Sequence, residues 1–239
     1  MTDSRERTTG LRAALSLPSV YRWFQGSLAI SCARHEVATT YIRAQPGDRV
    51  LDIGCGPAEV LQHLPAVRYF GLDYSAQYLQ EARRRYREHH PRPSFAQMDV
   101  RALRPGARRF DIVLAQGVLH HFDDAEAQSI LTAAAGSLSD TGRLITIDPA
   151  FDPAQSRVAR LLISNDRGRH VRSAAEYGRI AATAFEQVTT HVRHNLMRVP
   201  YTHVIMVCIK PQSGESATGP PCASALQLTQ QAPFPPRVD

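Results

Sequence analysis

The stretch RVLDIGCGPAEV at residues 49–60 decides the fold of this chain. Its apolar run, 50–53, follows a Pro-Gly-Asp turn, as expected of a buried strand in a parallel sheet. Gly54 and Gly56 then predict a tight turn, where the missing side chains let a ligand approach the backbone closely. Apolar residues at helical spacing over 59–64 predict a helix after the turn. A strand, a glycine turn and a helix form half of a nucleotide-binding βαβ unit, with the ligand at the carboxyl end of the strand.

The glycine spacing separates two kinds of nucleotide-binding turn. A nicotinamide-binding turn requires Gly-x-Gly-x-x-Gly, and Glu59 occupies the third glycine position here. The acidic Asp52 directly before the glycines also suits a cationic ligand better than a pyrophosphate. The stretch instead resembles motif I of the class I S-adenosylmethionine (SAM) methyltransferases. That motif is a hydrophobic run followed by Asp-x-Gly-x-Gly, matched here by Asp52, Gly54 and Gly56.

The resemblance covers about residues 45–210 and implies an α/β fold. The expected architecture is a Rossmann-like, seven-stranded, mostly parallel sheet with helices on both faces and a C-terminal antiparallel hairpin. Strand candidates at 185–194 and 202–209 supply that hairpin, which disfavours a nicotinamide dehydrogenase. The predicted divisions are an N-terminal leader with substrate-covering helices at 1–44, the methyltransferase domain at 45–210, and a disordered tail at 211–239.

Acidic residues end the second and third predicted strands. Asp73 follows Asp52 by about 20 residues, one βαβ step, and its carboxylate can accept hydrogen bonds from both ribose hydroxyls of an adenosine. In the family, an acid after the third strand accepts from the adenine amine, a role that the resemblance gives to Asp99. The implied cofactor is SAM. The implied cofactor-binding residues are Asp52, Gly54, Cys55, Gly56, Asp73, Tyr74, Asp99, Val100 and Gln116.

A second distinctive segment, FDIVLAQGVLHHF at 110–122, resembles motif IV of the same family. There the fourth strand ends beside the sulfonium. Because the unperturbed pKa of histidine lies near neutrality, His120 and His121 are candidate bases for an acceptor that arrives protonated. The alternative is that one histidine packs beneath the loop and the other faces adenine or solvent.

The fifth strand is expected at 143–148, after an Asp-Thr-Gly turn, with Pro149 ending it. In the family an acid at that strand end lies near the substrate, and Asp148 fits. Three arginines between 167 and 172, and the loop before the last strand, predict a cationic surface for an anionic or sugar-like acceptor. Alternatively, the loop residues satisfy hydrogen bonds at the sheet edge. The predicted acceptor-binding residues are Tyr21, Arg169, Tyr201 and His203.

The composition limits the classes of partner and the cellular setting that are expected. The net charge of +6 comes almost entirely from arginine, with Lys210 the only lysine, and no RNA-binding module accompanies it, so nucleic acid is an unfavoured partner. No apolar run reaches about 18 residues, so no membrane span is expected. Four widely separated cysteines without a CxxC pair predict a reduced, cytoplasmic setting and no metal site.

We therefore expect methyl transfer from SAM to a small-molecule acceptor, as in bacterial members of the family whose acceptor is unassigned. Two alternatives stay open. A nucleic-acid or protein methyltransferase would dock a macromolecule on the arginine-rich surface, and a non-catalytic SAM-binding protein would keep motif I without acceptor chemistry. The sequence leaves the acceptor, the methylated atom and the oligomeric state undetermined.

Overall fold

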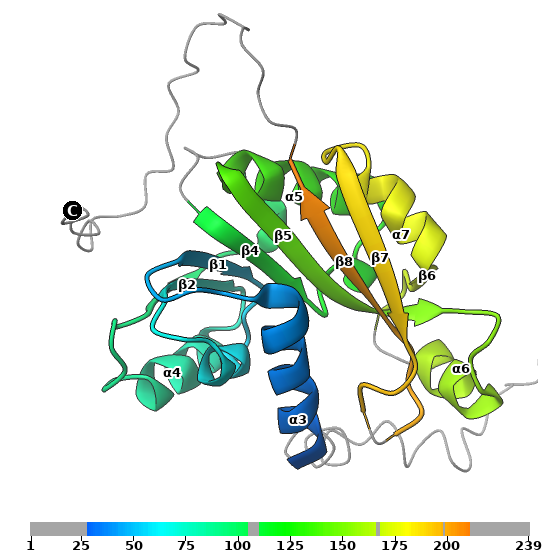
Figure 1. Cartoon of the computed structure of the whole chain (residues 1–239), viewed down its shortest axis with the longest axis horizontal. Coiled ribbons are helices and arrows are strands. Elements are labelled where there is room, and N and C mark those ends of the chain that lie inside the picture. The colour runs from blue at the N-terminus through cyan, green and yellow to red at the C-terminus, as the bar shows by residue number, and fades with distance from the viewer. Residues whose placement is uncertain (1–27, 105–109, 166–167, 198, 211–239) are drawn as a thin grey trace, which may run out of the picture.

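The computed structural model describes residues 28–104, 110–165, 168–197 and 199–210 (Figure 1). The helices are α3 (Leu28–Val37), α4 (Ala76–Arg85), α5 (Asp124–Ser137), α6 (Arg157–Ser164) and α7 (Ala174–Ala181). The strands are β1 (Arg49–Ile53), β2 (Arg68–Asp73), β3 (Ser94–Gln97), β4 (Phe110–Gln116), β5 (Leu138–Phe151), β6 (Arg172–Ser173), β7 (Gln187–Arg193) and β8 (His203–Ile209). Shorter turns are the π-helical η1 (Ala38–Ile42) and the 3₁₀ turns η2 (Glu59–His63), η3 (Val100–Ala102) and η4 (Leu119–His121).

The strands form one sheet in the order β3-β2-β1-β4-β5-β8-β7, with the two-residue β6 pairing with β5. Strands β1 to β5 are parallel to one another, whereas β8 runs antiparallel to both β5 and β7. This arrangement confirms the predicted Rossmann-like, mostly parallel sheet with a C-terminal antiparallel hairpin. Parallel strands place their carboxyl ends at one edge, so the loops that follow β1, β2 and β4 meet there.

Helices cover both faces of the sheet, as Figure 1 shows. Successive side chains of a strand point to opposite faces, so Val50 packs under α3 and α4 while Leu51 and Ile53 pack under α5 and α7. The two cores are nearly free of polar side chains, which explains why these strands read as continuous apolar runs. Among the described residues no helix is both long enough and apolar enough to cross a membrane.

The N-terminal segment packs onto the sheet through α3 and η1. Val37 and Ile42 are buried against β1 and η2. The Arg193 guanidinium of β7 donates to the Tyr41 hydroxyl at 3.0 Å and to Glu36 at 2.6 Å. These contacts fix the described part of the predicted substrate-covering region against β7, the outermost strand of the sheet on that side. The predicted acceptor residue Tyr21 lies outside the described residues.

The predicted helix after the glycine turn is shorter than expected, since η2 is a five-residue 3₁₀ turn. Ala58, the N-cap that precedes it, has a φ of +56° in the left-handed region, whereas a helix N-cap is typically extended. The Tyr86 hydroxyl donates to the Ala58 carbonyl at 2.8 Å and holds that conformation. A contact with the C-cap residue of α4 therefore accompanies the departure from the helix that the local periodicity predicts.

Strand β5 is longer than predicted and runs through both the Asp-Thr-Gly segment and Pro149. The backbone polar groups of successive residues in β5 point alternately toward β4 and toward β8. Those of Ile147 point toward β4, because its carbonyl accepts from the Gly117 N–H, and those of Ala150 point toward β8, because its N–H donates to the Thr202 carbonyl. By this alternation the backbone nitrogen of Pro149 points toward the β4 side, where β4 has already ended at Gln116. Its missing N–H therefore costs no ladder hydrogen bond.

Helix α5, which follows the histidine turn, begins with a capping box. Asp123 accepts from the Glu126 N–H at 2.9 Å, and Glu126 accepts from the Asp123 N–H at 3.3 Å. We expect Asp123→Ala to lower the free energy of unfolding by about 1 kcal/mol, seen as a Tm lower by roughly 3 °C in thermal unfolding. Glu186→Ala, an exposed carboxylate outside any helix, is the control and should leave Tm unchanged. Equal Tm values for the two variants would contradict the capping role.

Candidate cofactor and acceptor site

The glycine turn after β1 has one closed side and one open side. Gly54 has a φ of +70°, and a Cβ added to it would lie 2.7 Å from Val118 Cγ2, so no other residue fits. Gly56 has a φ of +53°, but a Cβ added there would meet nothing within 4 Å. The turn therefore leaves open space beside Gly56, at the edge where ligands of this fold class bind.

Asp73 joins this turn to β2. One carboxylate oxygen accepts from the Gly56 N–H and the other from the Ser75 N–H, both at 2.8 Å. Each oxygen retains a lone pair, so Asp73 can still accept from ribose hydroxyls while holding the turn. The ring of Tyr74, the next residue, is 74% exposed and available for stacking on a planar ligand.

Asp52 is a buried carboxylate with an unused acceptor. It is 2% exposed; its Oδ2 accepts from the Tyr69 hydroxyl at 2.5 Å, and its Oδ1 is buried without a hydrogen-bond partner. Burial raises the pKa of Asp52 to about 7, against the opposing effect of the Tyr69 hydrogen bond. Burial also raises the pKa of Tyr69, so that its hydroxyl remains a donor. An unpartnered buried carboxylate oxygen fits a cationic donor such as an α-ammonium group.

The side chains of two predicted cofactor residues, Cys55 and Asp99, are already engaged by other parts of the protein. The Cys55 thiol points into the core beside Gly71, and burial raises its pKa, so only its backbone remains for a ligand. Asp99 is held by the Arg101 side chain at 2.5 to 3.1 Å, and this hydrogen bonding lowers the Asp99 pKa. An adenine amine at Asp99 would share the carboxylate with Arg101.

The remaining two predicted cofactor residues flank the same edge. Val100 is buried at the start of η3, directly after Asp99. Gln116 is the last residue of β4 and is half-buried. Within the described part of the chain its side-chain amide makes no hydrogen bond, so its polar atoms are available to a ligand.

A histidine–carboxylate pair lies where β4 and β5 end. His120 is 5% exposed, and its Nδ1 lies 2.8 Å from Oδ1 of the fully buried Asp148, which also accepts from the His120 N–H at 3.2 Å. Because a carboxylate only accepts, we assign the proton to Nδ1, which leaves a lone pair on Nε2. This arrangement suits a general base whose protonated form is stabilised by the carboxylate.

The sequence placed Asp148 near the substrate but did not pair it with His120. The signal was present, because neighbouring parallel strands end at the same edge. The other predicted base, His121, is exposed, and its ring centroid lies 4.1 Å from that of His120. Of the two histidines, His120 is therefore the one that Asp148 orients.

The predicted acceptor residues reach the edge from two faces of the sheet. Gly168 packs on the His120 ring, since an added Cβ would overlap Cδ2, and the His170 N–H donates to the His120 carbonyl at 3.0 Å. Between them the exposed Arg169 is held beside the histidine turn. Tyr201 and His203, with ring centroids 5.0 Å apart, lie on the α3 face, opposite Asp148. The structure therefore does not bring Arg169 together with this pair on one face.

The predicted cationic surface is also smaller than expected. Arg172 is 7% exposed, and its guanidinium bonds to backbone carbonyls and Asp124. Arg193 is engaged by Glu36 and Tyr41, and Arg167 lies outside the described residues. The number of arginines in the sequence does not tell which of them are buried, and among the described residues Arg169 is what remains of the predicted surface beside His120.

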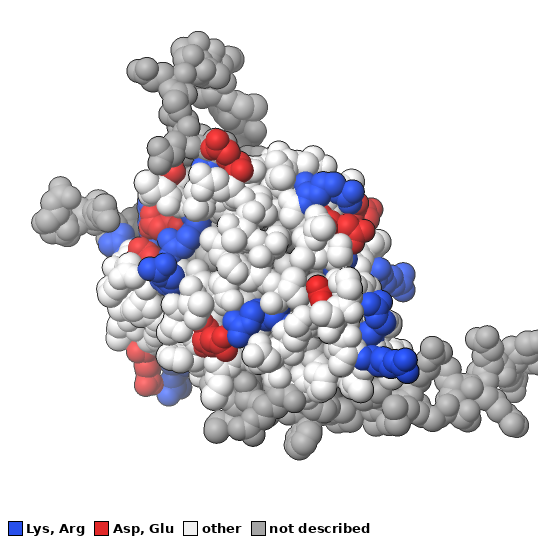
Figure 2. Space-filling view, turned by 45° about the vertical axis from the view of Figure 1, so that its right-hand side comes forward, with Lys and Arg blue, Asp and Glu red and all other residues white. Residues whose placement is uncertain are grey.

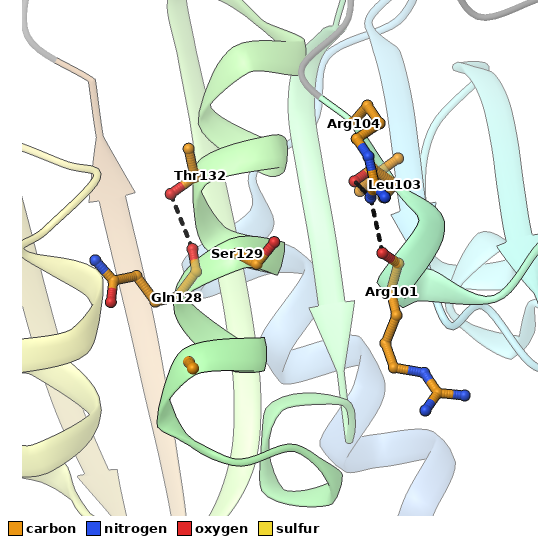
Figure 3. A pocket seen from close by; sticks show the side chains of 7 residues that line it. Arg101, Leu103, Arg104, Gln128, Ser129 and Thr132 are labelled. Atoms are coloured by element: carbon orange, nitrogen blue, oxygen red, sulfur yellow. Dashed lines mark hydrogen bonds between the residues drawn. The ribbon is translucent and has the colours of Figure 1, made fainter.

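A separate groove of about 490 Å³ lies between η3 and α5 (Figure 3). Its arginines are occupied: Arg101 by Asp99, and Arg104 by the carbonyl of Arg101 at 2.8 Å. The groove is lined by Arg101, Leu103, Arg104, Ala125, Gln128, Ser129 and Thr132. None of the predicted site residues is among them, so this groove is distinct from the site built on β1, β2 and β4.

Residues 50–142 match the model of the methyltransferase domain family. Together with the sheet topology, this match supports a class I SAM-dependent methyltransferase domain over these residues, which make up less than half of the chain. The cofactor of this class is SAM, and the residues present fit it: the methyltransferase turn is open at Gly56, and the unpartnered Asp52 oxygen suits the ammonium group of its methionyl part.

Among curated proteins, the methyltransferase domain is 32% identical over 133 residues to an uncharacterized 37.1 kDa protein in transposon TN4556 of Streptomyces fradiae, covering 54% of this chain and 38% of that protein. It is 26% identical over 130 residues to the eEF1A lysine and N-terminal methyltransferase of Bos taurus, covering 53% of this chain and 18% of that protein. The chain thus spans less than two-fifths of the length of these relatives.

Solved structures share the fold. The mitomycin 7-O-methyltransferase MmcR is 22% identical with a TM-score of 0.59, covering 85% of this chain and 61% of that one. Magnesium protoporphyrin IX methyltransferase (ChlM) from Synechocystis PCC 6803, solved with bound S-adenosylhomocysteine, is 19% identical with a TM-score of 0.59, covering 84% and 98%. The cyclase SpnF is 16% identical with a TM-score of 0.59, covering 74% and 80%. At these identities the likeness shows the fold alone.

The open side of Gly56 gives a direct test of the cofactor turn. We expect Gly56→Arg to fill that space and weaken SAM binding at least about 100-fold, roughly 2.7 kcal/mol, in isothermal titration. The matched control is Gly47→Arg, because Gly47 also has a positive φ, of +88°, with nothing within 4 Å of an added Cβ, at the opposite end of β1. Both variants bear a similar backbone strain of about 1–2 kcal/mol. Equal SAM affinity in the two would remove the turn from the cofactor site.

The raised pKa of Asp52 makes cofactor binding sensitive to pH. Because only the ionised carboxylate attracts an ammonium group, SAM affinity should fall about tenfold between pH 7.5 and pH 6. In the free protein the sign is opposite: the folded state holds the proton more tightly, so the free energy of unfolding falls as pH rises from about 4 to about 7.

Two variants check this assignment by calorimetry and thermal unfolding. Asp52→Asn should flatten both profiles. Tyr69→Phe should move their midpoints upward, because the hydrogen bond that lowers the Asp52 pKa is lost. Wild-type profiles that stay flat over this range would contradict a titrating Asp52.

Proposed function

We propose that this protein transfers the methyl group of SAM to a nucleophilic atom of a small-molecule acceptor, with His120 as general base. The observation that carries this proposal is the His120–Asp148 pair at the edge that also holds the cofactor turn. The neighbouring structures support a small acceptor, because MmcR and ChlM are named for small-molecule substrates.

The cofactor, when bound, supplies an activated methyl group on a sulfonium. The chain has three tasks. Asp52 and Asp73 hold the charged and ribose parts of the cofactor, and the rest of the edge orients the acceptor. Nε2 of His120 accepts the proton of the acceptor's nucleophile. Asp148, already bonded to Nδ1, stabilises the imidazolium that results.

Arg169 supports an acceptor that carries an anionic group or a sugar-like set of hydroxyls. It is exposed, has no carboxylate partner in the described part of the chain, and lies between two residues that touch His120. A guanidinium can bind a carboxylate or phosphate through two parallel hydrogen bonds. An acceptor could therefore present its nucleophile to His120 and its anionic group to Arg169, with Tyr201 and His203 approaching from the other face.

A protein acceptor is the second candidate, favoured by the similarity to the bovine eEF1A lysine and N-terminal methyltransferase. On the face in Figure 2, several basic side chains lie beside acids, one such pair in the lower middle, and other basic side chains follow one another down the right-hand side. Most of the face between them is free of charged side chains. Incubation of cell lysate with tritiated SAM and the protein separates the candidates, because label enters either the small-molecule, the protein or the nucleic-acid fraction.

The base assignment is tested with hydroxy- and amino-carboxylates and with their neutral analogues as acceptors. We expect His120→Gln to lower kcat at least about 100-fold with SAM affinity unchanged, because proton removal and not cofactor binding is lost. His121→Gln is the matched control, with an expected change of less than about threefold in kcat. Full activity in His120→Gln, or an equal loss in both variants, would refute His120 as the base.

A further inference from the structure

Arg172 is a buried arginine whose hydrogen bonds converge on the histidine turn. Nη1 donates to the Leu119 carbonyl at 3.2 Å and to the His170 carbonyl at 2.9 Å. Nη2 donates to the Phe122 carbonyl at 2.8 Å. Nε donates to Asp124 at 2.8 Å, and that carboxylate balances the buried charge.

The carbonyls that Arg172 binds bracket η4, the turn that carries His120. Leu119 is the first residue of the turn and Phe122 follows its last residue, so one guanidinium holds both ends. Within the turn the Leu119 carbonyl also accepts from the Phe122 N–H at 3.2 Å, so Arg172 gives it a second donor. An arginine can bind several carbonyls at once because its donors form a planar fork. A lysine ammonium is compact and cannot reach all of them at once.

The same guanidinium also fixes the segment that crosses the His120 ring. His170 accepts from Arg172 through its carbonyl and donates through its N–H to the His120 carbonyl. Gly168 lies against the ring, where an added Cβ would be 2.8 Å from Cγ. The His120 ring is thus bounded by Asp148 at Nδ1 and by Gly168 at Cδ2.

We infer that Arg172 is a positioning residue that holds the base and the acceptor-binding loop as one unit. Through Arg172, the loop that carries Arg169 is fixed relative to Nε2 of His120. The distance between base and anion-binding group is then a property of the folded chain, and acceptors with a matching separation of nucleophile and anion are selected. This inference rests on the proposed function for its consequence, but the positioning itself is testable without any acceptor.

A purely structural role is the competing explanation, since Arg172 also lies 5.5 Å from the centroid of the Tyr177 ring of α7. That role would affect stability but not the state of the His120 ring. The distinguishing measurement is the nitrogen NMR spectrum of His120 in the full chain loaded with S-adenosylhomocysteine. A proton held on Nδ1 gives two distinct ring-nitrogen signals, and loss of the fixed geometry averages them and speeds exchange of that proton.

We expect Arg172→Lys and Gly168→Ala to average the His120 nitrogen signals and to speed Nδ1 proton exchange at least about tenfold. Affinity for S-adenosylhomocysteine should change less than about threefold. Arg179→Ala, an exposed arginine of α7, is the matched control and should keep the wild-type spectrum. Asp148→Asn shows the spectrum of a ring without its carboxylate, and added guanidinium should restore the wild-type pattern in Arg172→Ala.

A wild-type His120 spectrum in Arg172→Lys would overturn the inference, even if Tm fell, because Gly168→Ala disturbs the ring by direct contact and serves only as the positive control. Should Arg172→Ala fail to fold, the milder Arg172→Lys still decides the question. A wild-type protein that methylates no acceptor would instead refute the proposed function, and the spectra would continue to report on Arg172. The two failures are therefore distinguishable.

Discussion

The carboxylate of Asp73 ties the cofactor edge together. By accepting from Gly56 and Ser75, it joins the turn after β1 to the turn after β2. Glycines at positive φ can adopt many conformations, so the turn needs an external partner to hold one. Asp73 supplies that partner from the adjacent strand. A parallel sheet makes this possible, because it brings both strand ends to the same edge.

Much of the fold could be predicted from the sequence because its signals are local. Apolar runs, strand-ending acids and the glycine turn each lie within a few residues, and they gave the sheet and its terminal hairpin. The errors have non-local causes. Ala58 is held at positive φ by a hydrogen bond from Tyr86, the C-cap residue of α4, and β5 continues through Pro149 because β4 has already ended beside it.

The same difference between local and non-local signals applies to the candidate site. Asp52, Asp73 and the glycines could be named because they form one short pattern. The link of His120 to Asp148 spans 28 residues, and the bonds of Arg172 to the same turn span about 50, so no local pattern connects them. Burial is the other missing information. Arg172 and Arg169 are alike in sequence, yet one is enclosed by carbonyls and the other faces solvent.

The acid of the proposed cofactor site and the proposed base approach from opposite faces of one sheet, and the short segment after β4 lies between them. Asp52 packs on the α3–α4 face and Asp148 on the α5–α7 face. Val118 packs against Gly54, where an added Cβ would lie 2.7 Å from Val118 Cγ2, while Gly117 lies beside the His120 ring. The fold alone does not decide the reaction, since SpnF shares it and is a cyclase. The proposed reaction of this chain depends on the α5–α7 face next to Gly117, where the buried Asp148 carboxylate orients His120.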